Sequence, residues 1–478
     1  MGSAERVQPN WLANVGWLSA ARVFGYLLPL ITLPIVVRVL GPEVYGKWVY
    51  AQAVVGFFGV AANPGLRTYG LQQVAARRKL AAGLLPPILS LLLTAALVSY
   101  IGLVGPIAVL TRDPTSRALV VLLGLNLVLS SVCANDWVFS GLQRFDRVAL
   151  LQVFSQLITT GGVVLLLRRS ETVWLLPVLA LVATAAGGLV GWRWLGRAGI
   201  RLSLRWSPGD WRDVLRVASF YGMASAMSMV YQKADHLMVG WLKGSAALGQ
   251  YGGAYRLMEA LMGFIAMGTS VVIPYAAATA ARDPGEFRQL IRKSLLVLAV
   301  VSVPLAAGGA FLADDLVALV LGPSYSASAP AFRVLMLAVP LGGLSSLFAG
   351  AVLYAPGHHR RYALAVGIGA VVNMVLNVVL IPPLGGIGAA IATAVAQGSV
   401  ALAAVAMGRG YLVGAFSRSL LSPFLASGGM AIALLVLQPY QIHVGFKVIA
   451  GALVYLAAVW MLDLLNGRDL RAAIRVGS

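Results

Sequence analysis

The chain has 478 residues, of which 59% are hydrophobic and only 11% are charged. Because soluble globular proteins carry about 25% charged residues, this composition excludes a soluble domain and indicates an integral membrane protein. The net charge of +20 would suggest nucleic acid in a soluble protein, so its placement along the chain has to be examined.

Predominantly apolar stretches of about 20 residues, the length that crosses a bilayer as a helix, recur along the whole sequence. A β-barrel would instead show alternating segments of about 10 residues. We therefore predict an all-α membrane protein with about fourteen transmembrane helices, their ends uncertain by about 2–4 residues. They lie at 11–37, 43–65, 83–110, 116–140, 147–167, 172–195, 214–241, 249–276, 290–312, 329–355, 362–381, 386–408, 419–437 and 443–464.

Most of the 36 lysine and arginine residues fall in loops on one side of these helices. Basic loops face the cytoplasm, so both termini are predicted to be cytoplasmic, in a multi-pass protein of the cell (inner) membrane. This placement explains the charge without nucleic acid as a partner. The longest inner connection, residues 193–216, mixes arginine and tryptophan, which suits contact with anionic membrane lipids.

The same connection suggests a domain boundary near residue 200. We predict an N-terminal six-helix lobe at 1–200, a second lobe at 201–410, and two additional helices with a cytoplasmic tail at 411–478. A shift of 203 residues supports two related halves, because it aligns similar residues after the first helix of each lobe: Gly41 with Gly244, Gly46 with Gly249, Trp48 with Tyr251 and Ala51 with Ala254. Halves with an even number of helices share one orientation, as in some transporters.

Ionisable residues inside spans are costly and usually face a cavity. Here they are Arg22, Lys233, Asp235, His236, Arg256, Glu259 and Arg333. Arginine and lysine outnumber acids in this set, and arginine binds phosphate in bidentate geometry. We therefore assign Arg22, Lys233, Arg256 and Arg333 to an anionic substrate, and Asp235 and Glu259 to coupling or gating.

Each of these residues also has a simpler explanation. Arg256 and Glu259 are spaced i,i+3 and can form a local ion pair, while Lys233 and Arg333 lie close enough to a helix end to reach the interface. Arg22 lies deepest, where its alternative is a structural hydrogen bond to helix carbonyls. Whether a proton or sodium would be the coupling ion stays open.

The sequence offers little for covalent chemistry. It contains no GxxxxGK[ST] nucleotide loop and no HExxH motif, and its four histidines are not spaced as a metal site. The single cysteine, Cys133, excludes an intrachain disulfide. We expect no cofactor, no metal and no enzymatic activity.

Three stretches resemble a known family. VVRVLGPEVYGKWVYAQAVVGFFGVAANPGLR at 36–67, ADHLMVGWLKGSAALGQYGGAYRLMEAL at 234–261 and LGPSYSASAPAFRVL at 321–335 are similar to segments of bacterial polysaccharide-biosynthesis flippases. These proteins belong to the multidrug/oligosaccharidyl-lipid/polysaccharide exporter superfamily. The resemblance implies two six-helix lobes in a V-shaped, alternating-access arrangement plus two C-terminal helices.

The resemblance also implies a substrate, an undecaprenyl-diphosphate-linked oligosaccharide moved from the inner to the outer leaflet. It implies a cationic cavity at Arg22, Lys233 and Arg256, with Asp235 as a conformational partner. A polysaccharide polymerase and a chain-length regulator are the expected protein partners. The polymer itself (exopolysaccharide, capsule or O-antigen) stays open.

Three alternatives are considered. A multidrug exporter of the same superfamily would favour carboxylates in its cavity, whereas the embedded charge here is mainly basic. A membrane polymerase or ligase would carry a long outer loop, but the longest loop is predicted inside. A lipid II flippase is a closer relative that the sequence leaves open.

Overall fold

The computed structural model describes residues 11–77, 81–110, 113–280, 282–411, 420–440 and 442–462. This part of the chain is helical and contains no strand. It divides into two compact units, Met1–Leu237 and Met238–Ser478, so that one long helix, α8, runs through the division. The predicted boundary near residue 200 stays a prediction.

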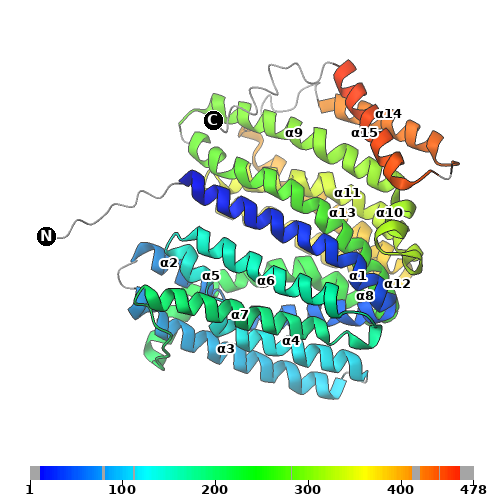
Figure 1. Cartoon of the computed structure of the whole chain (residues 1–478). Coiled ribbons are helices and arrows are strands. Elements are labelled where there is room, and N and C mark those ends of the chain that lie inside the picture. Colours follow the sequence, from blue (N-terminus) through cyan, green and yellow to red (C-terminus); the bar gives the residue numbers. More distant parts are fainter. Residues whose placement is uncertain are drawn as a thin grey trace. The chain divides into compact units, whose positions relative to one another are not determined.

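The first unit contains eight helical elements and the first part of α8 (Pro208–Ala280). They are α1 (Trp11–Ala62), α2 (Leu66–Ala76), α3 (Ala81–Leu110), α4 (Pro114–Cys133), α5 (Asp136–Gly141), α6 (Phe145–Leu166), η2 (Ser170–Thr172) and α7 (Leu175–Arg197). Figure 1 shows α3, α4, α7 and α6 side by side, and α4 packs on both α3 and α7. The core of this unit gathers where α2, α3, α5 and α7 meet, around Leu66, Leu89, Trp137 and Leu195.

The second unit begins within α8 and continues through ten elements. They are α9 (Pro284–Phe311), α10 (Ala313–Val320), η3 (Pro323–Ser328), α11 (Ala329–Ser345), η4 (Ser346–Tyr354), α12 (His359–Leu384), α13 (Gly386–Met407), η5 (Arg409–Tyr411), α14 (Leu421–Leu437) and α15 (Val444–Met461). Helices α14 and α15 pack together, and α14 packs on α9 (Figure 1). An ion pair of 2.9 Å between the buried Lys447 Nζ and the partly exposed Asp315 Oδ2 joins α15 to α10.

The two longest helices each contain two of the predicted spans, separated by one glycine. Gly41 in α1 has φ 69° and ψ 167°, and Gly244 in α8 has φ 84° and ψ 175°. This region of backbone space is open essentially to glycine alone. Gly41 and Gly244, which the 203-residue shift aligns, therefore share an unusual conformation as well as an identity. Ala51 and Ala254, ten residues after each glycine, are both fully buried.

Eleven helices in the described part are long and apolar enough to cross a membrane. Helices α1 and α8 each supply two of the predicted spans, and α14 is a shorter apolar helix of 17 residues. All fourteen predicted spans coincide with helices, so the all-α prediction is confirmed. The protein is a multi-pass membrane protein.

Candidate binding site in the first unit

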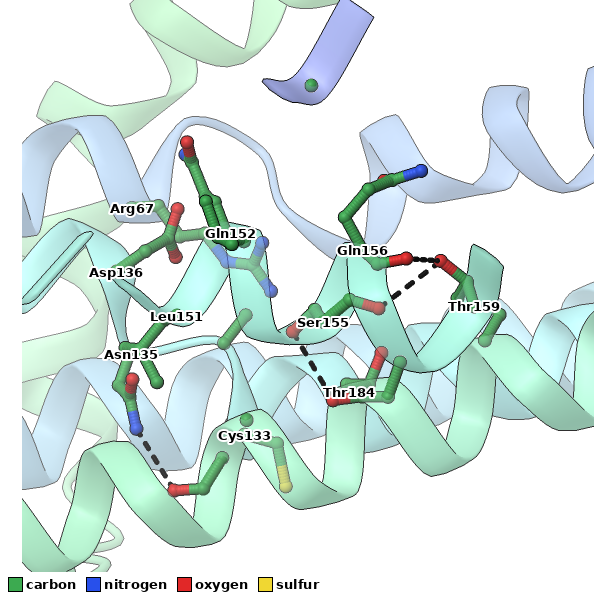
Figure 2. Close-up of a pocket in the computed structure, with 17 residues that line it drawn as sticks. Arg67, Cys133, Asn135, Asp136, Leu151, Gln152, Ser155, Gln156, Thr159 and Thr184 are labelled. Carbon is green, nitrogen blue, oxygen red and sulfur yellow. Dashed lines mark hydrogen bonds between the residues drawn. The ribbon is translucent and has the colours of Figure 1, made fainter. Parts of the chain in front are cut away.

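A cavity of about 510 Å³ lies inside the first unit. Helices α6 and α7 form its walls, and the link between α4 and α5 together with the start of α2 borders it (Figure 2). Gly25 of α1 also lines it. The cavity is thus built from segments spread over most of the unit's sequence.

One wall of the cavity is a polar stripe on α6. Gln152, Ser155, Gln156 and Thr159 are spaced i, i+3, i+4 and i+7 and therefore share one helix face. The Ser155 hydroxyl donates to the Ala183 carbonyl at 3.5 Å, and the Thr159 hydroxyl donates to carbonyls of its own helix. Within the described residues neither glutamine amide has a side-chain partner, so both remain available to a ligand (Figure 2).

The opposite wall, on α7, is made of small residues that include Ala180, Ala183 and Gly187. Their size leaves the space that the cavity occupies. Gly188 lets α7 approach the end of α4, because a Cβ added there would collide with Cys133. The Asn135 amide donates to the Gly188 carbonyl at 3.2 Å and fixes this approach.

A guanidinium borders the cavity where α2 begins. Helix α1 ends at Ala62, and the Asn63 side chain accepts a hydrogen bond of 3.2 Å from the Arg67 backbone N–H. The Arg67 Nη2 donates to the Ser130 carbonyl at 2.7 Å. Its Nε is buried and, among the described residues, has no hydrogen-bond partner. Arg67 therefore presents an unused N–H donor at a desolvated position, which favours an oxygen ligand.

Asp136, the first residue of α5, interacts electrostatically with Arg67 (Figure 2). The described lining thus holds one positive and one negative charge beside amides and hydroxyls, and no aromatic side chain. Drug-sized ligands usually occupy pockets lined by apolar and aromatic groups. This lining suits a polyhydroxylated ligand instead, because hydroxyls both donate and accept hydrogen bonds.

The described residues contain no group of three His, Cys, Asp or Glu side chains arranged to hold a metal ion. The arrangement around Arg67 can bind and orient a ligand.

The structure places the predicted residues of the first unit as follows. Arg22 lies in α1, three residues before the cavity-lining Gly25, and its side chain is outside the described part. Lys233 is half-buried in α8. Asp235 is 2% exposed, and its Oδ1 lies 2.8 Å from both the backbone nitrogen and the Nδ1 of His236.

In the second unit, Arg256 Nη1 and Glu259 Oε2 form an ion pair of 2.9 Å, which confirms the predicted i,i+3 interaction. Arg333 Nη2 contacts Asp314 Oδ2 at 2.6 Å, and its Nε donates to the Ala310 carbonyl. A single cationic cavity formed by Arg22, Lys233, Arg256 and Arg333 stays a prediction.

The sequence analysis assigned neither Arg67 nor Asp136 to a binding site. Two signals could have found the site. Asn135 and Asp136 interrupt an apolar stretch between two helices, and polar residues recur with helical spacing on α6. The sequence does not predict that α7 lines the cavity, because small residues in a membrane helix usually serve close packing.

The sequence was compared with known families. Residues 11–280, more than half of the chain, match the family model described as polysaccharide biosynthesis protein. The chain belongs to this family. A second model, MatE, matches residues 221–379 of this polysaccharide biosynthesis protein. The family predicted from the sequence is confirmed.

Curated relatives agree with this assignment. An Escherichia coli K12 protein named as an O-antigen transporter is 23% identical over 355 residues, which cover 70% of this chain and 80% of that protein. A Haloferax volcanii protein named as a low-salt glycan biosynthesis flippase is 23% identical over 385 residues, covering 79% of each chain.

Solved structures share the fold. The lipid II flippase MurJ, in an inward closed conformation, matches with a TM-score of 0.71 and 16% identity, covering 94% of this chain and 99% of that one. An inward-facing multidrug transporter of the MATE family matches with a TM-score of 0.61 and 15% identity, covering 84% of this chain and 98% of that one. At such low identity these matches establish the fold alone.

Proposed function

We propose that this polysaccharide biosynthesis protein is a flippase that moves a polyprenyl-diphosphate-linked oligosaccharide across the cell membrane, from the cytoplasmic to the outer leaflet. Both termini would lie in the cytoplasm. The relatives in Escherichia coli and Haloferax volcanii, whose names specify glycan or O-antigen transport, support the substrate class. The transport would proceed by alternating access without covalent chemistry.

The observation that carries the proposal is the lining of the first unit's cavity. The Gln152 and Gln156 side chains line the cavity and point away from α7 (Figure 2), so sugar hydroxyls would find hydrogen-bond partners there. The Arg67 Nε–H would donate to a hydroxyl or phosphate oxygen at one end. A hydrophobic drug would leave the buried Arg67 Nε–H unpaired, at a cost of about 1–3 kcal/mol.

The embedded cations complete the proposed mechanism. Arg22 lies about one turn from the cavity-lining Gly25 on α1, and would bring a guanidinium toward the diphosphate. Lys233, Arg256 and Arg333 would contact the same anionic group during transport. Asp235, buried beside His236, would exchange a proton or balance a cation when the conformation changes, with Glu259 contributing through its pair with Arg256.

The chain contains its own reporter for the cavity. Cys133 is the only cysteine in the sequence and lines the cavity beside Gly188. The test uses wild-type protein in liposomes and follows the rate of maleimide labelling of Cys133. We expect an undecaprenyl-diphosphate oligosaccharide to slow labelling about tenfold when present at about ten times its dissociation constant. Undecaprenyl phosphate without sugars should leave the rate unchanged.

Transport is measured in the same liposomes by the accessibility of the labelled glycan from either side. Movement of the glycolipid together with protection of Cys133 would support the proposal. Movement of lipid II but of no other oligosaccharide would identify the lipid II alternative. Efflux of organic cations without glycolipid movement would replace the proposal with a drug exporter.

A further inference from the structure

A second cavity lies inside the second unit, in a groove between α8 and α9. Its volume is about 370 Å³, and most of its lining is apolar. One side is formed by Phe264, Gly268 and Val271 of α8, and the other includes Val297 and Val301 of α9. Neither the sequence analysis nor the proposed glycan site accounts for it.

The groove is long. Its α8 side extends from Phe264 to Tyr275, and eleven residues of helix span about 16 Å. Its α9 side extends in the opposite chain direction from Leu290 to Val301. The floor includes Leu298, which is buried. This shape accommodates one extended apolar chain along the helices.

Gly268 gives the groove a local recess. A Cβ added at this position would meet no atom within 4 Å, so the glycine leaves open space rather than permitting close helix packing. A chain that carries methyl branches could place one of them here. An unbranched acyl chain would leave the recess empty and lose the corresponding contacts.

One end of the groove is polar and positively charged. Lys293 lines the groove together with Ser294 and Tyr275, in the half of the groove that is nearer the turn between α8 and α9. In the described part of the chain Lys293 has no ion-pair partner, and the nearby Asp283 instead caps α9 by accepting from the backbone nitrogens of Gly285 and Glu286. An ammonium at the end of an apolar groove complements a single chain with an anionic head.

We propose that this groove binds the polyprenyl phosphate part of the carrier lipid, with the first isoprene units between α8 and α9 and a phosphate at Lys293. The inference rests on the proposed function for the identity of the carrier. It favours a polyprenyl chain over a phospholipid because the open space at Gly268 gives the groove a recess for a methyl branch. The protein would hold the lipid end and the sugar end of one substrate at separate sites.

The test uses photo-crosslinking in liposomes. One probe is a polyprenyl phosphate with a diazirine in its first isoprene units, and the comparison probe is phosphatidylglycerol with a diazirine in one acyl chain. Labelled peptides are identified by mass spectrometry. We expect the polyprenyl probe to label residues 264–275 and 290–301, and phosphatidylglycerol to label them at background level.

Three variants sharpen the result. Gly268→Phe fills the recess and should lower groove labelling by the polyprenyl probe about tenfold. Gly367→Phe is the matched control, because Gly367 is also a helical glycine with open space around its missing Cβ, and its labelling should stay at the wild-type level. Lys293→Gln should lower labelling about tenfold through loss of the charge-assisted contact with phosphate.

Equal labelling by both probes would overturn the inference and identify an ordinary membrane-lipid site. Unchanged labelling in Gly268→Phe would overturn it as well. The experiment distinguishes this inference from the proposed function. Absence of glycolipid transport with intact groove labelling would refute the flippase function but not lipid binding in the groove. Transport with an unlabelled groove would refute the groove alone.

Discussion

The two units contain cavities of opposite character. The cavity of the first unit has a stripe of amides and hydroxyls on α6 and a buried guanidinium, whereas the groove of the second unit is apolar along its length and has one ammonium at its end. Both lie between apolar helices, so membrane residence does not explain the difference. Each lining matches one part of an amphiphile, the glycan or the carrier chain. If both proposals hold, the related halves have complementary tasks.

The largest expected effect comes from removing the cation of the first cavity. Arg67→Ala deletes a charged donor that holds the Ser130 carbonyl and faces the ligand, so glycolipid binding should weaken about 10- to 100-fold. Protection of Cys133 from maleimide, titrated with the glycolipid, measures this change. Labelling of the α8–α9 groove by the polyprenyl probe should not change.

Two variants separate charge from geometry at this position. Arg67→Lys keeps the charge but loses the planar fork, and should recover only part of the binding. Arg77→Ala removes an exposed arginine at the other end of α2 and should behave as wild type. Wild-type affinity in Arg67→Ala would exclude the residue from the site.

A second variant makes the cavity of the first unit less polar, and therefore more like the groove of the second unit. Gln152→Leu/Gln156→Leu removes both amides from the α6 stripe while nearly preserving its volume, and leaves the hydroxyls of Ser155 and Thr159 in place. We expect glycolipid binding to fall about tenfold, because two amide hydrogen bonds of about 0.5–1.5 kcal/mol each are lost. The same Cys133 titration measures it. Unchanged binding would mean that the stripe does not contact sugars.

Substitutions at Gly41 and Gly244 test whether the two halves share the same backbone requirement. Gly41→Ala and Gly244→Ala should each destabilise the protein by about 1–3 kcal/mol, since alanine is strained in this backbone region. Both sites have open space around the added Cβ, so the cost is conformational rather than steric. Thermal unfolding in detergent should show lower midpoints of similar size. An effect at only one glycine would break the equivalence.

The smallest effect is expected at Asp113, the N-cap of α4. Burial acts to raise the pKa of this carboxyl, but hydrogen bonds from Ser116 and the pairing with Lys47 outweigh burial and hold the pKa below its usual value. Asp113→Ala should therefore cost about 1 kcal/mol near neutral pH. Asp113→Asn keeps a capping oxygen and should cost less.

The pH dependence of this difference follows from the direction of the shift. A depressed folded-state pKa gives a stabilisation that is complete above the unfolded value of about 3.9. It is lost as the pH falls through the lower folded value. The gap between wild type and Asp113→Ala in thermal unfolding should be constant above about pH 5 and narrow below about pH 4. A gap that widens in acid would contradict this assignment.

The sequence predicted the helices well because apolar length and turn residues are local signals. Gly41-Pro42 and Asp283-Pro284 separate helices as expected. The local ion pair of Arg256 with Glu259 could be predicted equally well, since its geometry depends on helical spacing alone. These features require no knowledge of the tertiary structure.

The cavity of the first unit was not predicted because it depends on distant segments. Arg67 reaches the carbonyl of Ser130, and Asn135 reaches Gly188, so residues far apart in the sequence make the site. A basic residue near a helix end, such as Arg67, usually indicates only the topology of the chain. The groove was missed for a related reason: apolar faces of α8 and α9 look like any lipid-exposed surface in sequence.

The matching dihedral angles at Gly41 and Gly244 also bear on the origin of the chain. Crossing a membrane twice does not require a glycine in this conformation, since α6 and α7 are joined through the short helix η2 instead. Descent of both hairpins from one duplicated ancestor accounts for the coincidence. The backbone torsion angles at the two glycines have then been kept since the duplication, while substitutions have changed most of the side chains.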